Sequence, residues 1–331
     1  MKNNVQPVRL AMLGMIPGNG HPYSWSAIIN GYDEVEMARC PYAGIPVYLK
    51  EGRARIGIPG VRVSHVWTDD PADAVRVAAA ARISHVVSSP EDVIGEVDGV
   101  VIATDDGTDH ARRARPFVEA GLPVFIDKPL ATSESDLGAF VDWHQAGAKI
   151  LSSSGARYMP ELEQLRSELP GVGEIFWIAA LMIKSWERYG IHRVEPMFRL
   201  LGPGFQSVTM GPKAGVTEVA TLTHSSGACV TLAMADDVRP SFNEIRVVGS
   251  KRVLDASLVS TFDAFKRQLE AFVSFVRTGV SPIPFEHTLE MMGVLIAGIR
   301  SREQGNRPIL VADVLAPFRE RLRLVDALPA H

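Results

Sequence analysis

A lysine at the end of a buried strand is the first residue of this chain whose setting suggests chemistry. Lys128 belongs to the run Val124-Phe125-Ile126-Asp127-Lys128-Pro129, in which an apolar strand ends in a charged pair and a proline. Residues 100–104 form another apolar strand upstream, and residues 110–119 between the two strands have a helical pattern. These segments predict a β-α-β unit. Open α/β sheets bind their ligands at the carboxyl ends of the strands, so we expect Lys128 to reach a cleft.

A glycine-rich loop follows the first apolar run of the chain, residues 8–15. The loop reads Gly14-Met15-Ile16-Pro17-Gly18-Asn19-Gly20-His21, and a helical pattern comes after it at residues 24–30. Its spacing is not the strict G-x-G-x-x-G fingerprint. Its glycines would still let backbone N–H groups approach a pyrophosphate in front of a helix N-terminus. For the loop alone, a turn that needs positive φ angles is an equally good interpretation.

An acidic pair follows the next apolar strand, residues 61–68. In dinucleotide-binding folds the second strand usually presents an acid to the adenosine ribose. Thr68 stands at the expected position and Asp69 one place later. Asp69 is therefore a candidate for the ribose hydroxyls, and it would repel a 2′-phosphate, which weakly favours NAD. The alternative is that Asp69 and Asp70 only cap the helix that begins at Pro71.

The alternation of strands and helices in the first half predicts a doubly wound parallel sheet. Later in the chain strands dominate and indicate a mainly antiparallel sheet, followed by two amphipathic helices. The strands are expected at residues 175–183, 216–222, 228–235 and 244–248, and the helices at residues 262–277 and 288–302.

We therefore expect an α/β protein with two domains. Residues 1–131 would form a dinucleotide-binding Rossmann domain, and residues 132–331 an α/β domain with an open sheet for substrate binding and oligomerisation. The helix at residues 133–145 is expected to pack on the first domain. Residues 39–60 are rich in glycine and proline, and we expect them to be a non-core insertion beside the cofactor cleft.

Composition excludes several classes of protein. The chain has 331 residues, of which 46% are hydrophobic, so it is long enough for two globular domains. A formal net charge of −4 with interspersed signs predicts neither nucleic-acid nor membrane binding. The two cysteines, Cys40 and Cys229, lack metal-ligand spacing, which fits a reducing compartment. Since no apolar signal core or membrane-length run is present, we expect a cytoplasmic protein.

The chain resembles the Gfo/Idh/MocA oxidoreductases, a family named for glucose-fructose oxidoreductase and inositol dehydrogenase. The resemblance is carried by residues 100–104, His110 and residues 119–129, and it continues in residues 155–160, 190–195 and 286–290. It implies NAD or NADP as cofactor, a small polyol or sugar as substrate, and a homodimer or homotetramer built on the open sheet face.

The resemblance also implies catalytic roles. Asp127-Lys128-Pro129 matches a Glu-Lys-Pro motif whose lysine lies beside the nicotinamide and can stabilise charge on the reacting oxygen. Residues 188–195 match an Asp-x-Gly-x-His-x-x-Asp motif, in which His192 would be the general acid or base. Arg188 replaces the first Asp of that motif and Glu195 the last, and Glu195 is expected to share the helix face of His192.

The expected binding residues form two sets, and no metal ligand is expected. Arg157 and Tyr158 match a family motif, whereas Lys184, Trp186 and Tyr189 could line a sugar pocket or simply pack. The cofactor set is Gly14, Met15, Ile16, Gly18, Asn19, Gly20, His21, Thr68, Asp69, Ala103, Thr104, Asp105, His110, Asp127 and Lys128; the substrate set is Arg157, Tyr158, Lys184, Trp186 and Tyr189.

The implied reaction is hydride transfer between a nicotinamide and a secondary hydroxyl of a sugar, cyclitol or related polyol. Two alternatives stay open. One is a catalytically inactive nucleotide- or sugar-binding regulatory protein, favoured by the irregular glycine loop, Thr68 and Arg188 and opposed by the retention of Lys128 and His192. The other is an NAD-dependent lyase or hydrolase that acts through a transient keto intermediate.

Overall fold

The computed structural model describes residues 7–215, 217–235 and 243–326, and the chain divides into two compact units. The first unit comprises Met1–Asp127, Gly147–Ser152 and Thr261–Pro282. The second comprises Lys128–Ala146, Ser153–Ser260 and Ile283–His331. The chain thus passes between the units several times, whereas the sequence suggested one boundary near residue 131.

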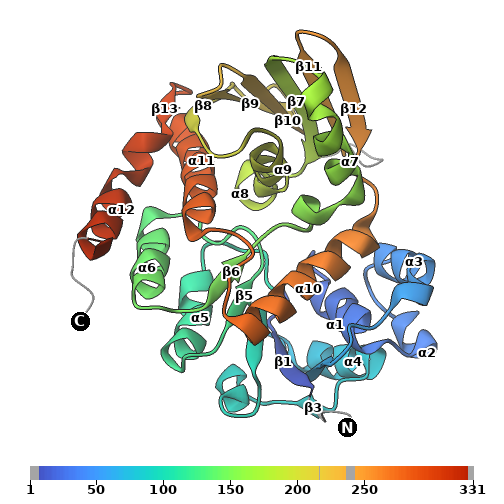
Figure 1. Ribbon diagram of the computed structural model, residues 1–331. Helices are drawn as coiled ribbons and strands as arrows, with labels where there is room; N and C mark the ends of the chain where they lie inside the picture. The colour runs from blue at the N-terminus through green and yellow to red at the C-terminus, as the bar shows by residue number, and fades with distance from the viewer. Residues whose placement is uncertain (1–6, 216, 236–242, 327–331) are drawn as a thin grey trace. The chain divides into compact units, whose positions relative to one another are not determined.

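The first unit is a doubly wound parallel sheet with the strand order β3-β2-β1-β4-β5-β6 (Figure 1). The order reverses between β1 and β4, and such a switch point is where doubly wound sheets bind ligands. The strands are β1 Val8–Leu13, β2 Val61–Trp67, β3 His85–Val86, β4 Gly99–Ile102, β5 Val124–Ile126 and β6 Ile150–Ser152.

Helices surround this sheet, and their ends follow the capping signals of the sequence. The Asp70 side chain accepts a hydrogen bond from the Ala72 N–H, and Pro71 begins the next helix as expected. Trp25 packs edge-on against Phe125 of β5, with ring centroids 5.5 Å apart. The helices are α1 His21–Asn30, α2 Glu34–Met37, α3 Gly44–Glu51, η1 Arg53–Arg55, α4 Pro71–Ala81, η2 Pro90–Val93, α5 His110–Glu119 and α10 Thr261–Thr278.

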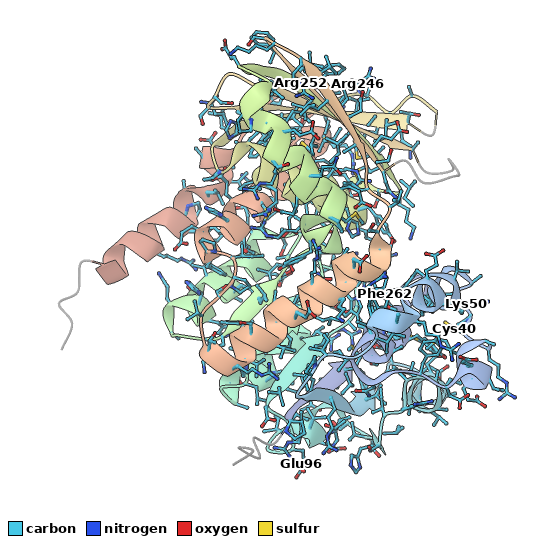
Figure 2. The ribbon with its side chains drawn as sticks, turned by 45° about the vertical axis from the view of Figure 1, so that its right-hand side comes forward. Cys40, Lys50, Glu96, Arg246, Arg252 and Phe262 are labelled. Atoms are coloured by element: carbon cyan, nitrogen blue, oxygen red, sulfur yellow. The ribbon has the colours of Figure 1, made fainter. Side chains whose placement is uncertain are left out.

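Residues 39–60 differ from the expected non-core insertion. They contain α3, whose Leu49 side chain is fully buried, so part of this segment belongs to the core of the first unit. Phe262, at the start of α10, lies so close to Gly52 that a Cβ there would come within 2.3 Å of its ring; Figure 2 marks Phe262 and, on α3, Lys50. The high glycine content therefore reflects close helix packing as well as loops.

The second unit is built on a mixed, mainly antiparallel sheet with the order β12-β11-β7-β10-β9-β8-β13. Only the β7–β10 pair is parallel among the pairs of described residues. Val216, at which one expected strand begins, lies outside the described residues. The strands are β7 Ile175–Ile183, β8 Phe205–Met210, β9 Thr217–His224, β10 Cys229–Ala235, β11 Glu244–Gly249, β12 Val253–Ser257 and β13 Ile309–Leu310.

Helices cover one face of this sheet, where α9 contacts β7 and α11 contacts β8. The Phe176 and Trp177 side chains on β7 are 50% and 40% exposed to solvent.

The helix α6 packs on α11 and α12 within the second unit, so the expectation that it packs on the first unit was wrong. The helix α10, which comes late in the chain, belongs to the first unit. The helices are α6 Glu134–Gln145, η3 Gly155–Tyr158, α7 Pro160–Glu168, η4 Leu169–Gly171, α8 Trp186–Tyr189, α9 Ile191–Leu201, α11 Phe285–Glu303 and α12 Val311–Asp326.

Candidate active site

The glycine loop lies at the switch point of the first sheet, between β1 and α1. Gly14 has a φ of +85°, and a Cβ on it would come within 2.8 Å of the Thr104 Cγ2 atom after β4. Gly18 also has a φ of +85°, but a Cβ there would meet no atom within 4 Å. The loop therefore needs glycine for close packing at its start and for its backbone conformation at its exposed tip.

Two side chains of the loop hold the acid that precedes Lys128. The Asn19 amide nitrogen donates to the Asp127 Oδ2 atom at 3.2 Å and to the Ala103 carbonyl at 2.9 Å. His21 Nδ1 donates to the same Asp127 oxygen at 2.8 Å, since a carboxylate only accepts. The Asn19 Oδ1 atom in turn accepts from the His21 N–H. The loop thereby fixes the end of β5 from which Lys128 departs.

The residues around this loop fit a dinucleotide. The Thr104 hydroxyl is buried at the carboxyl end of β4 and has no hydrogen-bond partner, which is unfavourable unless a bound group supplies one. The tip at Gly18 leaves room for a ligand, and α1 begins directly after the loop. Met15 and Ile16 complete this cradle.

The end of β2 differs in detail from the expectation for a ribose site. The Thr68 hydroxyl donates to the Asp70 carbonyl at 2.5 Å and its side chain is buried. Asp69 accepts from the Met15 N–H at 3.1 Å and from the Arg113 guanidinium at 2.7 Å. Thr68 is thus a turn residue, while Asp69 joins the loop to α5 and remains about one-third exposed.

Three further members of the expected cofactor set lie after β4. Ala103 and Asp105 are buried, and the Ala103 N–H continues the ladder by donating to the Leu13 carbonyl. His110 is fully buried and its Nε2–H donates to the Thr104 carbonyl at 2.9 Å. The geometry of His110 therefore closes the turn that presents Thr104.

In the second unit, Lys128 and His192 both lie beside one aromatic ring, that of Tyr189. Lys128 is 2% exposed, its Nζ atom lies 5.0 Å from the centroid of the Tyr189 ring, and its peptide bond to Pro129 is cis. The His192 ring packs edge-on to the same ring at a centroid distance of 5.0 Å. Two residues far apart in the sequence thus lie near the same ring.

Ser154 orients His192. The Ser154 Oγ atom lies 2.6 Å from His192 Nδ1 and also accepts the Ala156 N–H at 3.1 Å. The Ser154 contact at Nδ1 therefore fixes the orientation of the His192 ring. Ser154 was absent from the predicted site, and nothing in the sequence marks it, because the contact depends on how η3 meets α9.

Glu195 holds the backbone of Ser154, the residue that contacts His192. It is fully buried, accepts the Ser154 N–H at 2.5 Å and pairs with the Arg157 guanidinium at 3.4 Å. Burial raises the pKa of Glu195 to about 7, although Arg157 and the Ser154 N–H act in the opposite direction. The geometry points to a positioning role for Glu195.

The expected substrate residues separate into two kinds. Trp186 is fully buried and its indole N–H donates to the Leu295 carbonyl at 2.7 Å, so it is a core residue and does not line a sugar pocket. Tyr158 lies 3.4 Å from the Ser153 hydroxyl, and burial raises its pKa to about 12. Lys184, by contrast, reaches the Tyr189 hydroxyl at 2.5 Å and so belongs to the same group as Lys128 and His192.

The described residues also bear on metals and membranes. No group of three or more His, Cys, Asp or Glu side chains is arranged to hold a metal ion within residues 7–215, 217–235 and 243–326. In the same part of the chain, the helices fall short of the length and apolar character that crossing a bilayer requires.

The first unit has the topology of a Rossmann fold, and the second unit adds an open sheet with a lysine and a histidine beside one ring. Residues 46–154 match the Gfo/Idh/MocA model, described as an oxidoreductase family with an NAD-binding Rossmann fold. These residues make up about a third of the chain.

Curated relatives that match part of this chain include inositol 2-dehydrogenases. Inositol 2-dehydrogenase 1 of Saccharopolyspora erythraea is 36% identical over 118 residues, 34% of this chain and 35% of the relative. Inositol 2-dehydrogenase of Rhodococcus erythropolis is 37% identical over 113 residues, 33% of this chain and 32% of the relative. The chain thus matches about a third of the length of these relatives.

The fold as a whole has close counterparts. The crystal structure of scyllo-inositol dehydrogenase from Lactobacillus casei, with bound NAD(H) and scyllo-inositol, has a TM-score of 0.73 at 15% identity and covers 93% of this chain and all of its own. Myo-inositol 2-dehydrogenase from Lactobacillus plantarum has a TM-score of 0.74 at 15% identity, covering 92% and 99% of the two chains. At these identities the similarity concerns the fold.

Proposed function

We propose that this protein is an NAD(P)-dependent oxidoreductase that transfers hydride between the nicotinamide and a secondary hydroxyl of a cyclitol, sugar or related polyol. The observation that carries the proposal is the placement of Lys128 and His192, an amine and an imidazole, beside the same Tyr189 ring. A hydroxyl that loses hydride must also lose a proton, and this pair supplies a charge to stabilise the oxygen and a base to accept the proton.

The contacts of His192 suit proton exchange in both directions. If the Ser154 hydroxyl donates to Nδ1, the neutral ring carries its proton on Nε2 and can protonate a carbonyl oxygen. If Nδ1 donates to Ser154, Nε2 carries no proton in the neutral ring and can accept a hydroxyl proton. Ser154 can take either role because its oxygen both donates and accepts, which matches a reversible alcohol–carbonyl reaction.

Lys128 is suited to hold the reacting oxygen. Its side chain is buried, so its charge acts in a medium where water screens it little. The backbone just before Lys128 is held in place, because the Asp127 side chain is hydrogen-bonded to Asn19 and His21. We propose that Lys128 Nζ donates a hydrogen bond to the substrate oxygen and stabilises negative charge that develops on it.

The cofactor would be held by residues of the glycine loop, with Thr104 as an additional donor. When bound, the nicotinamide supplies the hydride chemistry, and the protein supplies position and electrostatics. We propose NAD rather than NADP as the preferred cofactor, because the Asp69 carboxylate lies at the end of β2 and would repel a 2′-phosphate. Arg113 beside Asp69 reduces this preference without reversing it.

The function is tested by binding and turnover. Titration calorimetry with NADH and with NADPH should give heat with at least NADH, and NAD⁺ should be reduced in the presence of a member of a cyclitol and sugar panel. Lys128→Ala should bind the nucleotide and fail to reduce it. Absence of heat with either nucleotide would remove the proposal. Product formation with no net change in NADH would instead support the lyase or hydrolase reaction.

A further inference from the structure

Tyr189 is the centre of a cluster of charged and titratable groups in the second unit. The Lys184 Nζ atom lies 2.5 Å from the Tyr189 hydroxyl and 4.1 Å from its ring centroid. Lys128 and the His192 ring lie at 5.0 Å from the same ring. Tyr189 thus touches both residues of the proposed reaction and has a lysine of its own at its oxygen.

The local backbone is arranged to hold this cluster. Lys184 follows β7 with a φ of +63°, a left-handed conformation that is unfavourable for a non-glycine residue. The next helix, α8, is fixed by Trp186, whose buried indole is hydrogen-bonded to the Leu295 carbonyl of α11. Trp186 therefore positions Tyr189, and the strained Lys184 backbone places an ammonium at the phenol.

The other charged groups near Tyr189 come from its own helix and the helices beside it. Glu187 of α8 is paired with Arg302 of α11, and His192 of α9 is bonded to Ser154. The Nζ atoms of Lys184 and Lys128 lie over the Tyr189 ring. An ammonium has only donors, so the phenol oxygen accepts from Lys184 and directs its own proton elsewhere. A donating ammonium stabilises negative charge on the oxygen that it contacts.

We propose that Tyr189, held by Lys184, is a second proton-transferring residue of the site, one that touches the substrate beside His192. This proposal rests on the proposed function. In the oxidative direction the substrate O–H bond breaks, and its proton passes first to the Tyr189 phenolate oxygen and from there to His192, which is the final acceptor of the one proton released. The C–H bond breaks as its electron pair leaves with hydride for NAD⁺, and the C–O bond becomes C=O. The substrate loses two electrons and the nicotinamide gains them. Lys184 stabilises the phenolate and is a positioning residue.

Activity measurements separate the hydroxyl of Tyr189 from its ring. Tyr189→Phe keeps the aromatic face and removes only the oxygen, so we expect turnover to fall roughly a hundredfold or more with little change in KM. Tyr32→Phe, which removes a phenol oxygen from the first unit, is the matched control and should keep full turnover. If Tyr189→Phe retains at least half of the parent turnover, Tyr189 is only a wall of the pocket and the proposal fails.

The Lys184 contact is tested through the pH dependence of turnover. Lys184→Met removes the charge and keeps a side chain of similar length, so the pH at which oxidation reaches half of its maximal rate should rise. Lys251→Met, on the β11–β12 turn, is the control and should leave the pH profile of the rate unchanged. An unchanged profile in Lys184→Met would contradict the role given to Lys184.

A spectroscopic titration of the protein without nucleotide gives a second readout. Tyrosinate absorbance of the parent should include one early step, missing in Tyr189→Phe and displaced to higher pH in Lys184→Met. Lack of this step would overturn the proposal. If the step is present but no polyol is oxidised, the phenol–ammonium pair stands and the proposed function fails. If polyols are oxidised equally well by Tyr189→Phe, this inference alone fails.

Discussion

At the residue scale, Lys128 and His192 are expected to act on one hydroxyl. Lys128→Ala and His192→Ala should each lower turnover by roughly two to four orders of magnitude, because each removes charge stabilisation or proton transfer. Nucleotide affinity should change little. The double variant should lose much less than the product of the two single effects, since groups that act as a unit are not additive. Steady-state kinetics on the polyol found by screening provide the measurement; a fully active single variant would remove that residue from the mechanism.

Cofactor choice is expected to depend on Asp69. Asp69→Ser removes the carboxylate that would repel a 2′-phosphate and releases the Arg113 guanidinium now paired with it. The ratio of the Kd values for NADPH and NADH should therefore fall by roughly tenfold, as about 1.4 kcal/mol of repulsion is lost. Calorimetry on the parent and the variant measures this ratio. A ratio that does not move would show that Asp69 only ties the loop to α5.

Individual site residues could be predicted from the sequence where chain geometry alone fixes them. Lys128 is such a case, because an apolar strand in a parallel sheet delivers its last residues to one edge. Ser154 could not be predicted, since its contact with His192 joins positions 38 residues apart through tertiary packing. Trp186 was misassigned because an aromatic residue near a histidine is compatible with both a pocket and a core, and the buried hydrogen bond to Leu295 decides for the core.

At the scale of elements, the β1–α1 loop is expected to be the most sensitive turn of the first unit. Gly14→Ala would add backbone strain at φ +85° and a clash with Thr104, whereas Gly95→Ala adds strain at φ +87° where no atom lies within 4 Å. We expect Gly95→Ala to cost about 1–2 kcal/mol of unfolding free energy and Gly14→Ala to cost more and weaken NADH binding. Urea denaturation and calorimetry compare the two; equal behaviour would contradict the packing described for the loop.

Elements with strong local signals could be predicted well. The helix α4 begins at Pro71 behind the Asp70 cap, as the sequence indicates. The helix α3 could not be predicted, because its glycine and proline residues suggest a loop, and its formation depends on burying Leu49. That α10 belongs to the first unit could not be predicted either, since an amphipathic pattern shows that a helix packs but not on which partner.

For the whole molecule, Glu195 should make stability depend on pH. Its pKa in the folded protein is about 7 against an ordinary value of 4.5, so the folded state keeps a proton that the unfolded state has lost. The stabilisation is therefore complete below about pH 4.5 and is lost as the pH rises through about 7. The slope contributed by this group is at most about 1.4 kcal/mol per pH unit.

The variant Glu195→Gln cannot ionise, so its unfolding free energy should fall less than that of the parent between about pH 5 and about pH 7.5. Glu96→Gln, at the exposed position marked in Figure 2, is the control and should follow the parent. Urea denaturation at several pH values gives the comparison. A Glu195→Gln curve parallel to that of the parent would show that Glu195 is ionised throughout this range.

The central claim, hydride transfer from a polyol carbon, is tested most directly by following that hydrogen. The protein would be incubated with NAD⁺ and a panel of cyclitols and sugars deuterated at their secondary carbons, and the recovered nicotinamide cofactor would be analysed by mass spectrometry. The account predicts that one deuterium per turnover appears in the reduced cofactor with the parent protein, and that deuterated cofactor accumulates roughly two to four orders of magnitude more slowly with Lys128→Ala. Reduced cofactor without deuterium, or no reduced cofactor from any member of the panel, would contradict it.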